Sequence, residues 1–177
     1  MSVRTGPDVS THPDPDTFRR AMGLLPTGVT VITAGSGEHT EALTVSSVTS
    51  VSLAPLLVLV SVGTRGRMLR RIEEHGAFTV NVMARDQEPL SRLFASHDRP
   101  VGTEAQRWLG DRVGRTGNVL VEGAVLSVDC RTENRYPGGD HAILLGRVNA
   151  VHTAEHRGEP LLHHRGAYAG LAAGVMT

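Results

Sequence analysis

Short runs of β-branched and apolar residues dominate the first third of the chain. Val, Ile, Thr and Ser fill residues 28–34 and 41–53, and an uninterrupted apolar run covers residues 56–62. Runs of this length and composition predict strands, and the continuous run predicts a strand buried on both faces. The glycines within 35–37 and the Ala-Pro pair at 54–55 separate them, and 41–53 is long enough for two strands or one bent strand.

The same signals continue in the second half. Residues 77–83 form another strand-like run, and apolar and polar residues alternate along 124–130 with the period of a strand. A turn at 137–139 precedes a further strand at 142–151. Many strands, few helices and no regular βαβ alternation predict a mainly β fold whose antiparallel sheet closes as a barrel.

Three segments carry apolar residues at helical spacing: 14–25, 64–75 and 86–95. The first begins with Asp14 and Pro15, a capping carboxylate followed by proline at the first helical position. Thr64 is in a position to cap the second segment, and Gly76 ends it. Residues 96–117 show no period and are expected to be irregular.

Length and composition fit one folded unit. A chain of 177 residues with 40% hydrophobic residues can bury a core of its own. Residues 1–13 are polar, with Gly and Pro, and predict a flexible N-terminal tail. We therefore expect a single domain over 14–177.

Charge and residue usage exclude several functions. The 18 basic and 18 acidic residues cancel, so nothing favours nucleic acid or an anionic membrane. Lysine is absent, which removes Schiff-base chemistry and the lysine of a phosphate loop. One cysteine, Cys130, excludes an intramolecular disulfide. The N-terminus has no apolar leader, and the longest apolar run is too short for a membrane helix. We expect a soluble, cytoplasmic protein.

Two segments have the composition of a ligand site. Residues 44–47 (Thr-Val-Ser-Ser) are small, so a flat ring could lie close to their amides and hydroxyls, although an ordinary Ser- and Thr-rich edge strand has the same composition. Residues 61–67 (Ser-Val-Gly-Thr-Arg-Gly-Arg) lead into a predicted helix. Free amides there, with Arg65 and Arg67, attract anions such as phosphate. A solvated arginine face is the alternative interpretation.

Histidines supply the remaining candidates. Residues 139–141 (Gly-Asp-His) precede a predicted strand, where His141 could contact a ligand or pass a proton, or could be a structural residue bonded to Asp140. His163 and His164 are adjacent, would face opposite ways on a strand and could not share a metal ion. We expect no metal site. Neither a dinucleotide-binding glycine motif nor a nucleophile elbow is present.

Five segments, in order and spacing, resemble the flavin reductase-like domain family: FRRAMGLLPTGVTVITA, LTVSSVTSVSLAPLLVLVSV, FTVNVMARDQEPLSRLFAS, GGDHAILLGRV and PLLHHRGAY. The resemblance runs from Phe18 to Tyr168. The family consists of short-chain NAD(P)H:flavin oxidoreductases that partner two-component flavin monooxygenases. It commonly has Asp-Arg-Phe where this chain has Asp98-Arg99-Pro100.

The resemblance implies a split β-barrel of the FMN-binding type that forms a homodimer. It also implies FMN or FAD as the flavin, NADH or NADPH as the hydride donor, and a separate monooxygenase that receives reduced flavin. Protein residues need only stack and orient two rings in such an enzyme. Two alternatives remain open: an oxidoreductase of the same fold that retains its flavin and acts on a pathway metabolite, and a non-catalytic flavin-binding module.

The resemblance also implies roles for single residues. Those at 44–47 would line the isoalloxazine ring, and Asn81 would support the site from its strand. The ribityl phosphate side would be addressed by Ser61, Thr64, Arg67 and residues 94–96. His141 resembles the nicotinamide-side histidine and is the catalytic candidate, with Tyr168 helping to close that pocket. The full set of cofactor-binding candidates is Thr44, Val45, Ser46, Ser47, Ser61, Thr64, Arg67, Asn81, Phe94, Ala95, Ser96, His141 and Tyr168.

Overall fold

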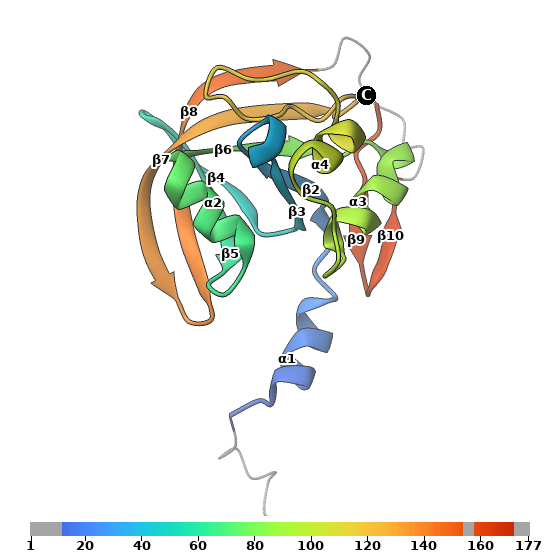
Figure 1. Ribbon diagram of the computed structural model, residues 1–177. Coiled ribbons are helices and arrows are strands. Elements are labelled where there is room, and N and C mark those ends of the chain that lie inside the picture. The colour runs from blue at the N-terminus through green and yellow to red at the C-terminus, as the bar shows by residue number, and fades with distance from the viewer. Residues whose placement is uncertain (1–11, 154–157, 172–177) are drawn as a thin grey trace, which may run out of the picture.

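The computed structural model describes residues 12–153 and 158–171, and its main feature is an antiparallel sheet of seven strands (Figure 1). The strands are β2 (Thr30–Ala34), β3 (Glu41–Val45), β4 (Val48–Leu53), β5 (Leu56–Gly63), β6 (Ala77–Val82), β7 (Leu126–Gly138) and β8 (His141–Thr153). They lie in the order β3-β2-β6-β7-β8-β5-β4.

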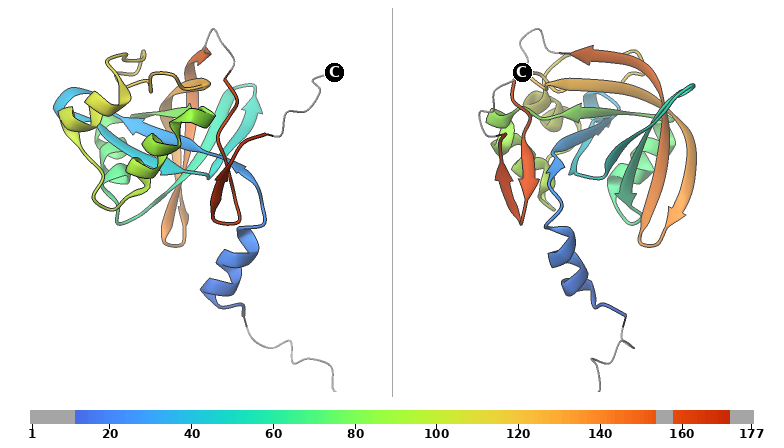
Figure 2. Two further views of the ribbon diagram at one scale, coloured as in Figure 1. Left: turned by 90° about the vertical axis from the view of Figure 1, so that its right-hand side faces the viewer. Right: turned by 180° about the vertical axis from the view of Figure 1, so that it is seen from behind.

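The two edges of this sheet are neighbours in the chain. β3 is one edge and β4 is the other, and only Ser46 and Ser47 join them. Edges linked by two residues must lie close in space, so the sheet curls into a barrel whose β3 and β4 edges meet without pairing (Figure 2). The predicted mainly β, split-barrel fold is confirmed.

Two cores fill the space on either side of the strands. The first lies inside the barrel, where Met68, Leu69 and Ile72 of α2 (Arg67–His75) pack beside Phe78 and Leu144. The second lies outside β2 and β3, where α3 (Glu88–Ala95) and α4 (Gly102–Leu109) cover the sheet. β2 is buried along its whole length because it contributes to both cores.

A second, smaller sheet lies beside α3. It has the order β1-β9-β10, from β1 (Thr27–Gly28), β9 (Leu162–His164) and β10 (Ala167–Ala169). Its β9–β10 hairpin also anchors the N-terminal segment, because the Arg165 amide donates to the Gly23 carbonyl over 2.7 Å. The 3₁₀ helices η1 (Gly37–His39) and η2 (Arg85–Gln87) complete the described elements.

The N-terminal helix α1 (Pro15–Met22) projects from the barrel (Figures 1 and 2). The Asp14 carboxylate accepts hydrogen bonds from the amides of Asp16 and Thr17, so the predicted cap is confirmed. None of the residues of α1 is buried, and Phe18 and Met22 are largely exposed. No helix within 12–153 and 158–171 is both long and apolar enough to cross a membrane.

Several predictions about single elements were wrong. The residues expected to be irregular contain α4, a short helix held by its buried Ala105 and Leu109. Thr64 does not cap α2, which begins at Arg67 after Gly66; its hydroxyl donates to the Asp140 carbonyl instead. The apolar run at 56–62 is not buried on both faces, because only Val60 and Val62 of β5 are fully inside. Residues 41–53 form two strands, which is one of the two predicted alternatives.

The apolar side of β7 faces the first core, where Cys130 is fully buried and Val128 packs against it, but the polar side of the strand is buried as well. Ser127 and Asp129 are buried, whereas Leu126 and Val128 are only partly covered. The buried carboxylate of Asp129 accepts hydrogen bonds from the Thr79 hydroxyl and from the amide and hydroxyl of Thr116. These donors satisfy the charge and allow the polar side of β7 to be buried.

Candidate functional site

A pocket of about 240 Å³ opens at the seam of the barrel, where β3 ends. We call it the seam pocket. Residues from β3, the β3–β4 link, α3 and the small sheet converge there although they are far apart in the sequence. The lining residues are Val29, Thr44, Val45, Ser46, Ala95, His163 and Tyr168.

Hydrogen bonds to neighbouring elements fix the polar wall of the seam pocket. The Thr44 hydroxyl donates to the Ser91 carbonyl of α3 over 2.7 Å, and the Ser47 hydroxyl donates to the Ser61 carbonyl of β5 over 2.9 Å. These two hydroxyls therefore hold the β3 end against its neighbours. Ser46 is exposed and lies between them. The wall thus presents the backbone and the Ser46 side chain to a ligand.

Aromatic and cationic groups form the opposite rim. The His163 and Tyr168 rings meet edge to face at 5.6 Å, and the Arg92 guanidinium lies 4.7 Å above the Tyr168 ring. Burial of the phenol raises the pKa of Tyr168, so its hydroxyl stays protonated at neutral pH. The rim therefore combines a neutral phenol with a cation that stacks on its face.

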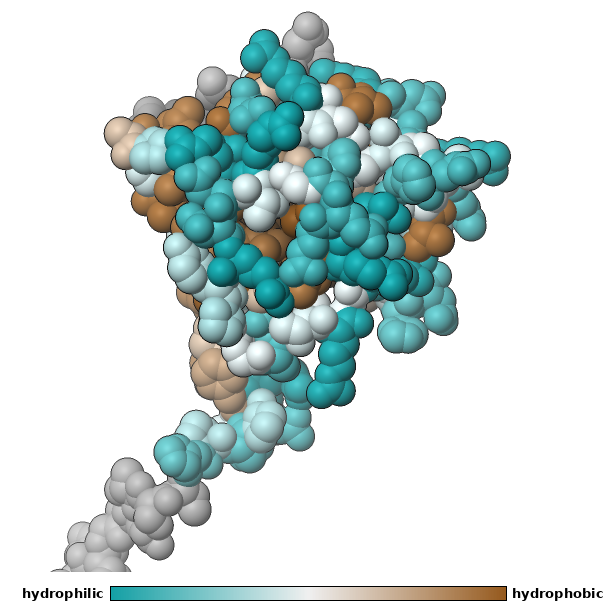
Figure 3. Space-filling view, turned by 60° about the vertical axis from the view of Figure 1, so that its left-hand side comes forward, coloured by the Kyte–Doolittle hydropathy of each residue, from teal (hydrophilic) through white to brown (hydrophobic). Residues whose placement is uncertain are grey.

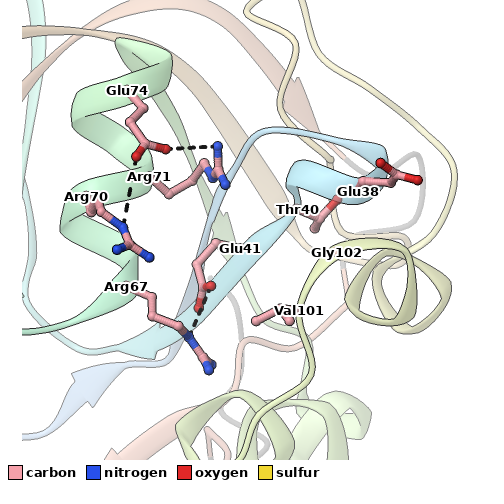
Figure 4. A pocket seen from close by; sticks show the side chains of 9 residues that line it. All are labelled: Glu38, Thr40, Glu41, Arg67, Arg70, Arg71, Glu74, Val101 and Gly102. Atoms are coloured by element: carbon pink, nitrogen blue, oxygen red, sulfur yellow. Dashed lines mark ion pairs between the residues drawn. The ribbon is translucent and has the colours of Figure 1, made fainter.

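Of the residues assigned to phosphate, Arg67 lies at the other end of β3, whereas Ser61 bonds to Ser47 and Ala95 lines the seam pocket. Arg67 begins α2, and its guanidinium faces Glu41 at the start of β3, beside a polar recess of about 190 Å³ (Figure 4). Arg99, three residues after Ser96, binds the same carboxylate. The visible face on the α2 side of the molecule is mostly hydrophilic (Figure 3).

His141 lies at the tip of the β7–β8 hairpin, outside the seam pocket. Its ring nitrogen Nδ1 is 2.7 Å from the Asp140 carboxylate, and hydrogen bonding with His141 lowers the pKa of Asp140. The backbone amide of Thr64 donates to the Asp140 carbonyl, so the hairpin tip rests on the segment before α2. The His141 side chain is 49% exposed. The sequence analysis gave a bond between His141 and Asp140 as the alternative interpretation, and that bond is present.

Two other candidates lie in the core. Phe94 is fully buried in the second core, while its neighbour Ala95 lines the seam pocket and Ser96 is exposed. Asn81 is fully buried, donating to the Val31 carbonyl and accepting from the Val121 amide. Its amide is occupied by protein partners, so any contribution to the site is through the barrel wall.

Sequence reasoning missed three residues of the seam pocket: Val29, His163 and, at its rim, Arg92. His163 was weighed only as a metal ligand beside His164. The Arg165-Gly166 turn, with both residues at positive φ, signals a hairpin that brings His163 opposite Tyr168. Within the described residues no three His, Cys, Asp or Glu side chains are grouped to hold a metal ion.

Comparison with known proteins assigns the chain to a family. A model described as flavin reductase like domain matches residues 22–172. An NADH-dependent FMN reductase of Streptomyces nodosus subsp. asukaensis is 60% identical over 164 residues, covering 93% of this chain and 89% of that protein. The reductase component of 4-hydroxyphenylacetate 3-monooxygenase of Thermus thermophilus is 35% identical over 88% of this chain and 96% of its own.

A solved structure agrees with the sequence matches. The NADH:FAD oxidoreductase SgcE6 of Streptomyces globisporus superposes with a TM-score of 0.83 at 34% identity, covering 95% of this chain and 99% of that one. The family model spans most of the chain and the relatives match nearly their whole length. The chain belongs to the flavin reductase like domain family.

Proposed function

We propose that the chain is an NADH-dependent flavin reductase that supplies reduced flavin to a separate monooxygenase. The observation that carries this proposal is the seam pocket, where Thr44, Ser46 and Tyr168 line one hollow. The family membership and the relatives described above support the same activity.

The residues present fit a flavin in size and chemistry. Small side chains and open backbone at Thr44–Ser47 suit a flat ring with carbonyl and nitrogen edges. The seam pocket is smaller than the sites that usually hold a whole cofactor, about 300–1,000 Å³, so it suits the ring alone. Arg67 pairs with Glu41 at the far end of β3, and Glu41 lies four residue steps or about 14 Å along the strand from Val45, so a phosphate at that end is within reach of an elongated ligand.

The chain's own residues bind and orient in this proposal. A bound flavin accepts a hydride from NADH, and that chemistry belongs to the cofactors. Ser46 and the β3–β4 backbone hold the ring edge, while the rim of Tyr168 and His163 limits the width of the seam pocket. His141 stays the candidate for the nicotinamide side. Because this reaction needs no nucleophile or metal from the protein, the polar but unreactive lining is sufficient.

FMN is the flavin that we favour. The FMN reductase relative is 60% identical, whereas an FAD reductase relative is 42% identical over 74% of this chain. NADH is the donor in the names of both. We also expect the protein to work in the cytoplasm, where NADH is available, and to pass reduced flavin to an oxygenase by diffusion or transient contact.

We further propose that two copies form a homodimer through an apolar groove of about 320 Å³. Strands β4, β5, β7 and β8 line it, and its rim carries exposed Leu53, Leu56 and Val151. Leu53 is 84% exposed in the single chain. Apolar surface of this extent on strand faces is typical of a subunit interface, and a second copy is the partner that family resemblance supports.

Anaerobic mixing of the purified protein with NADH and excess FMN tests the function. Repeated loss of the oxidised flavin band near 450 nm (roughly the flavin absorption maximum), at protein far below flavin, supports the reductase. Reduction limited to one equivalent of bound flavin would instead favour an oxidoreductase that retains its cofactor. No reduction, with flavin bound, would leave a binding module.

A further inference from the structure

A buried carboxylate links two arginines beside the recess at the α2 end of β3. We call Glu41, Arg67 and Arg99 the Glu41 bridge. The Glu41 side chain is 6% exposed, and Arg99 approaches its Oε1 atom with Nη2 at 3.1 Å and Nε at 3.2 Å. Arg67 approaches Oε2 with Nε at 3.4 Å (Figure 4). One carboxylate therefore orients two guanidinium groups.

Arg99 is the fixed member of the Glu41 bridge. Its side chain is only 11% exposed, and besides Glu41 it donates from Nε to the Ala42 carbonyl over 2.8 Å. Its Nη1 atom lies 3.5 Å from the Ser96 carbonyl at the end of α3. These contacts tie β3 to the turn that follows α3. The planar guanidinium of Arg99 can make all of these contacts at once because it carries several N–H donors in a fixed arrangement. Lysine, with a single ammonium group, could not.

Arg67 is the exposed member. Its Nη2 atom donates to the Arg99 carbonyl over 3.2 Å, and the side chain as a whole is 45% exposed. The Glu41 and Arg99 contacts hold one edge of the guanidinium and leave the rest open to solvent. Two arginines and one glutamate leave one positive charge in the Glu41 bridge. This charge lies on the exposed side, because Glu41 and Arg99 are buried as a pair.

We propose that Glu41 and Arg99 are positioning residues that hold Arg67 ready for the phosphate of FMN. This inference rests on the proposed function, since it assigns the phosphate end of the same flavin. A preorganised guanidinium loses less freedom when it binds an anion than a free arginine does. Arg99 acts through Arg67 and does not itself contact the flavin.

The variant Arg99→Lys tests this role because it keeps the charge and removes the fork. Dissociation constants for FMN and riboflavin, which lacks the phosphate, are measured by quenching of flavin fluorescence. We expect FMN to bind about five- to tenfold more weakly and riboflavin to change less than about twofold. Arg135→Lys is the matched control, because Arg135 is about as exposed as Arg67, pairs with Glu73 of α2 and does not line the recess; it should leave both constants unchanged.

A double-mutant cycle separates positioning from general support of the fold. In the Arg67→Ala background, Arg99→Lys should weaken FMN binding less than about twofold further, because the residue it positions is gone. Equal losses for FMN and riboflavin, or additive losses in the cycle, would overturn the inference. If Arg99→Lys does not fold, the exposed Arg67→Lys variant tests the same geometry: an FMN-selective loss supports it and unchanged FMN binding refutes it. A wild-type protein that binds neither flavin would refute the proposed function itself.

Discussion

Removal of the His141 side chain separates a role in hydride transfer from a role in the fold. The structure allows a sharp expectation, because the ring bonds to the Asp140 carboxylate and the side chain is 49% exposed. The Thr64 contacts at this hairpin go to the Asp140 carbonyl and survive the substitution His141→Ala. An exposed pair of this kind adds little to stability, so the melting temperature should move by roughly two degrees or less.

The expected loss of activity is large, in contrast to the small expected loss of stability. If the imidazole borders the nicotinamide, His141→Ala should lower kcat/KM for NADH about tenfold or more, while the dissociation constant for FMN changes little. Asp140→Asn is a companion variant that keeps the ring but removes the carboxylate that orients it. It should give a smaller loss of the same kind, because Asp140 acts only through His141.

Anaerobic stopped-flow measurement is the decisive assay. The FMN-loaded variant is mixed with a range of NADH concentrations, and the rate of flavin reduction is followed at the flavin band. A lower limiting rate indicates lost orientation in the hydride step, and half-saturation at a higher NADH concentration indicates weaker NADH binding. Wild-type rates at every NADH concentration would refute the assignment of His141. A drop in melting temperature of many degrees would show that the hairpin contact is structural.

Four further outcomes follow from the structure. Arg67→Ala should weaken FMN binding about tenfold or more and leave riboflavin nearly unaffected; equal losses would refute a phosphate contact. Burial raises the pKa of Cys130 to about 12, so the native thiol should resist alkylation at pH 8 and react only after unfolding. Leu53→Asp should shift sedimentation from dimer to monomer without lowering stability; an unchanged dimer would refute the groove as the interface. Gly146→Ala should lower the free energy of unfolding, measured by denaturant melts, by about 1–3 kcal/mol, because the new Cβ would lie 2.5 Å from a buried phenyl ring. Gly63→Ala is the control, because a Cβ at Gly63 would have no neighbouring atom within 4 Å.

Local signals in the sequence predicted the elements whose ends are chemically marked. Asp14 caps α1, and Gly76 ends α2 in the left-handed conformation, both as expected. α4 was missed because it begins after Val101 without a capping side chain and buries only Ala105 and Leu109. A helix with so little local signal is formed by its packing against the second core, which no short window of sequence reveals.

The burial of the polar side of β7 could not be predicted from its pattern. Alternation identifies which residues share a face, and apolar residues are normally placed inside. Here Asp129 is buried because Thr79 and Thr116 supply its donors, and these residues come from 50 and 13 positions away. For the site, family resemblance led to Thr44, Ser46 and Tyr168, which the fold brings together, but gave no sign that His163 joins them.

The unpaired seam between β3 and β4 has a consequence for turnover. Everywhere else in the barrel, widening the gap between neighbouring strands breaks a ladder of main-chain hydrogen bonds. At the seam the β3 and β4 edges are connected by Ser46 and Ser47 without a ladder between the two strands, so widening the seam breaks no ladder of main-chain hydrogen bonds. A ligand that enters and leaves there does so without local unfolding of the sheet. An entrance at the unpaired seam suits a reductase whose flavin must be exchanged in every cycle. It predicts that the rate of flavin dissociation does not depend on the global stability of the barrel.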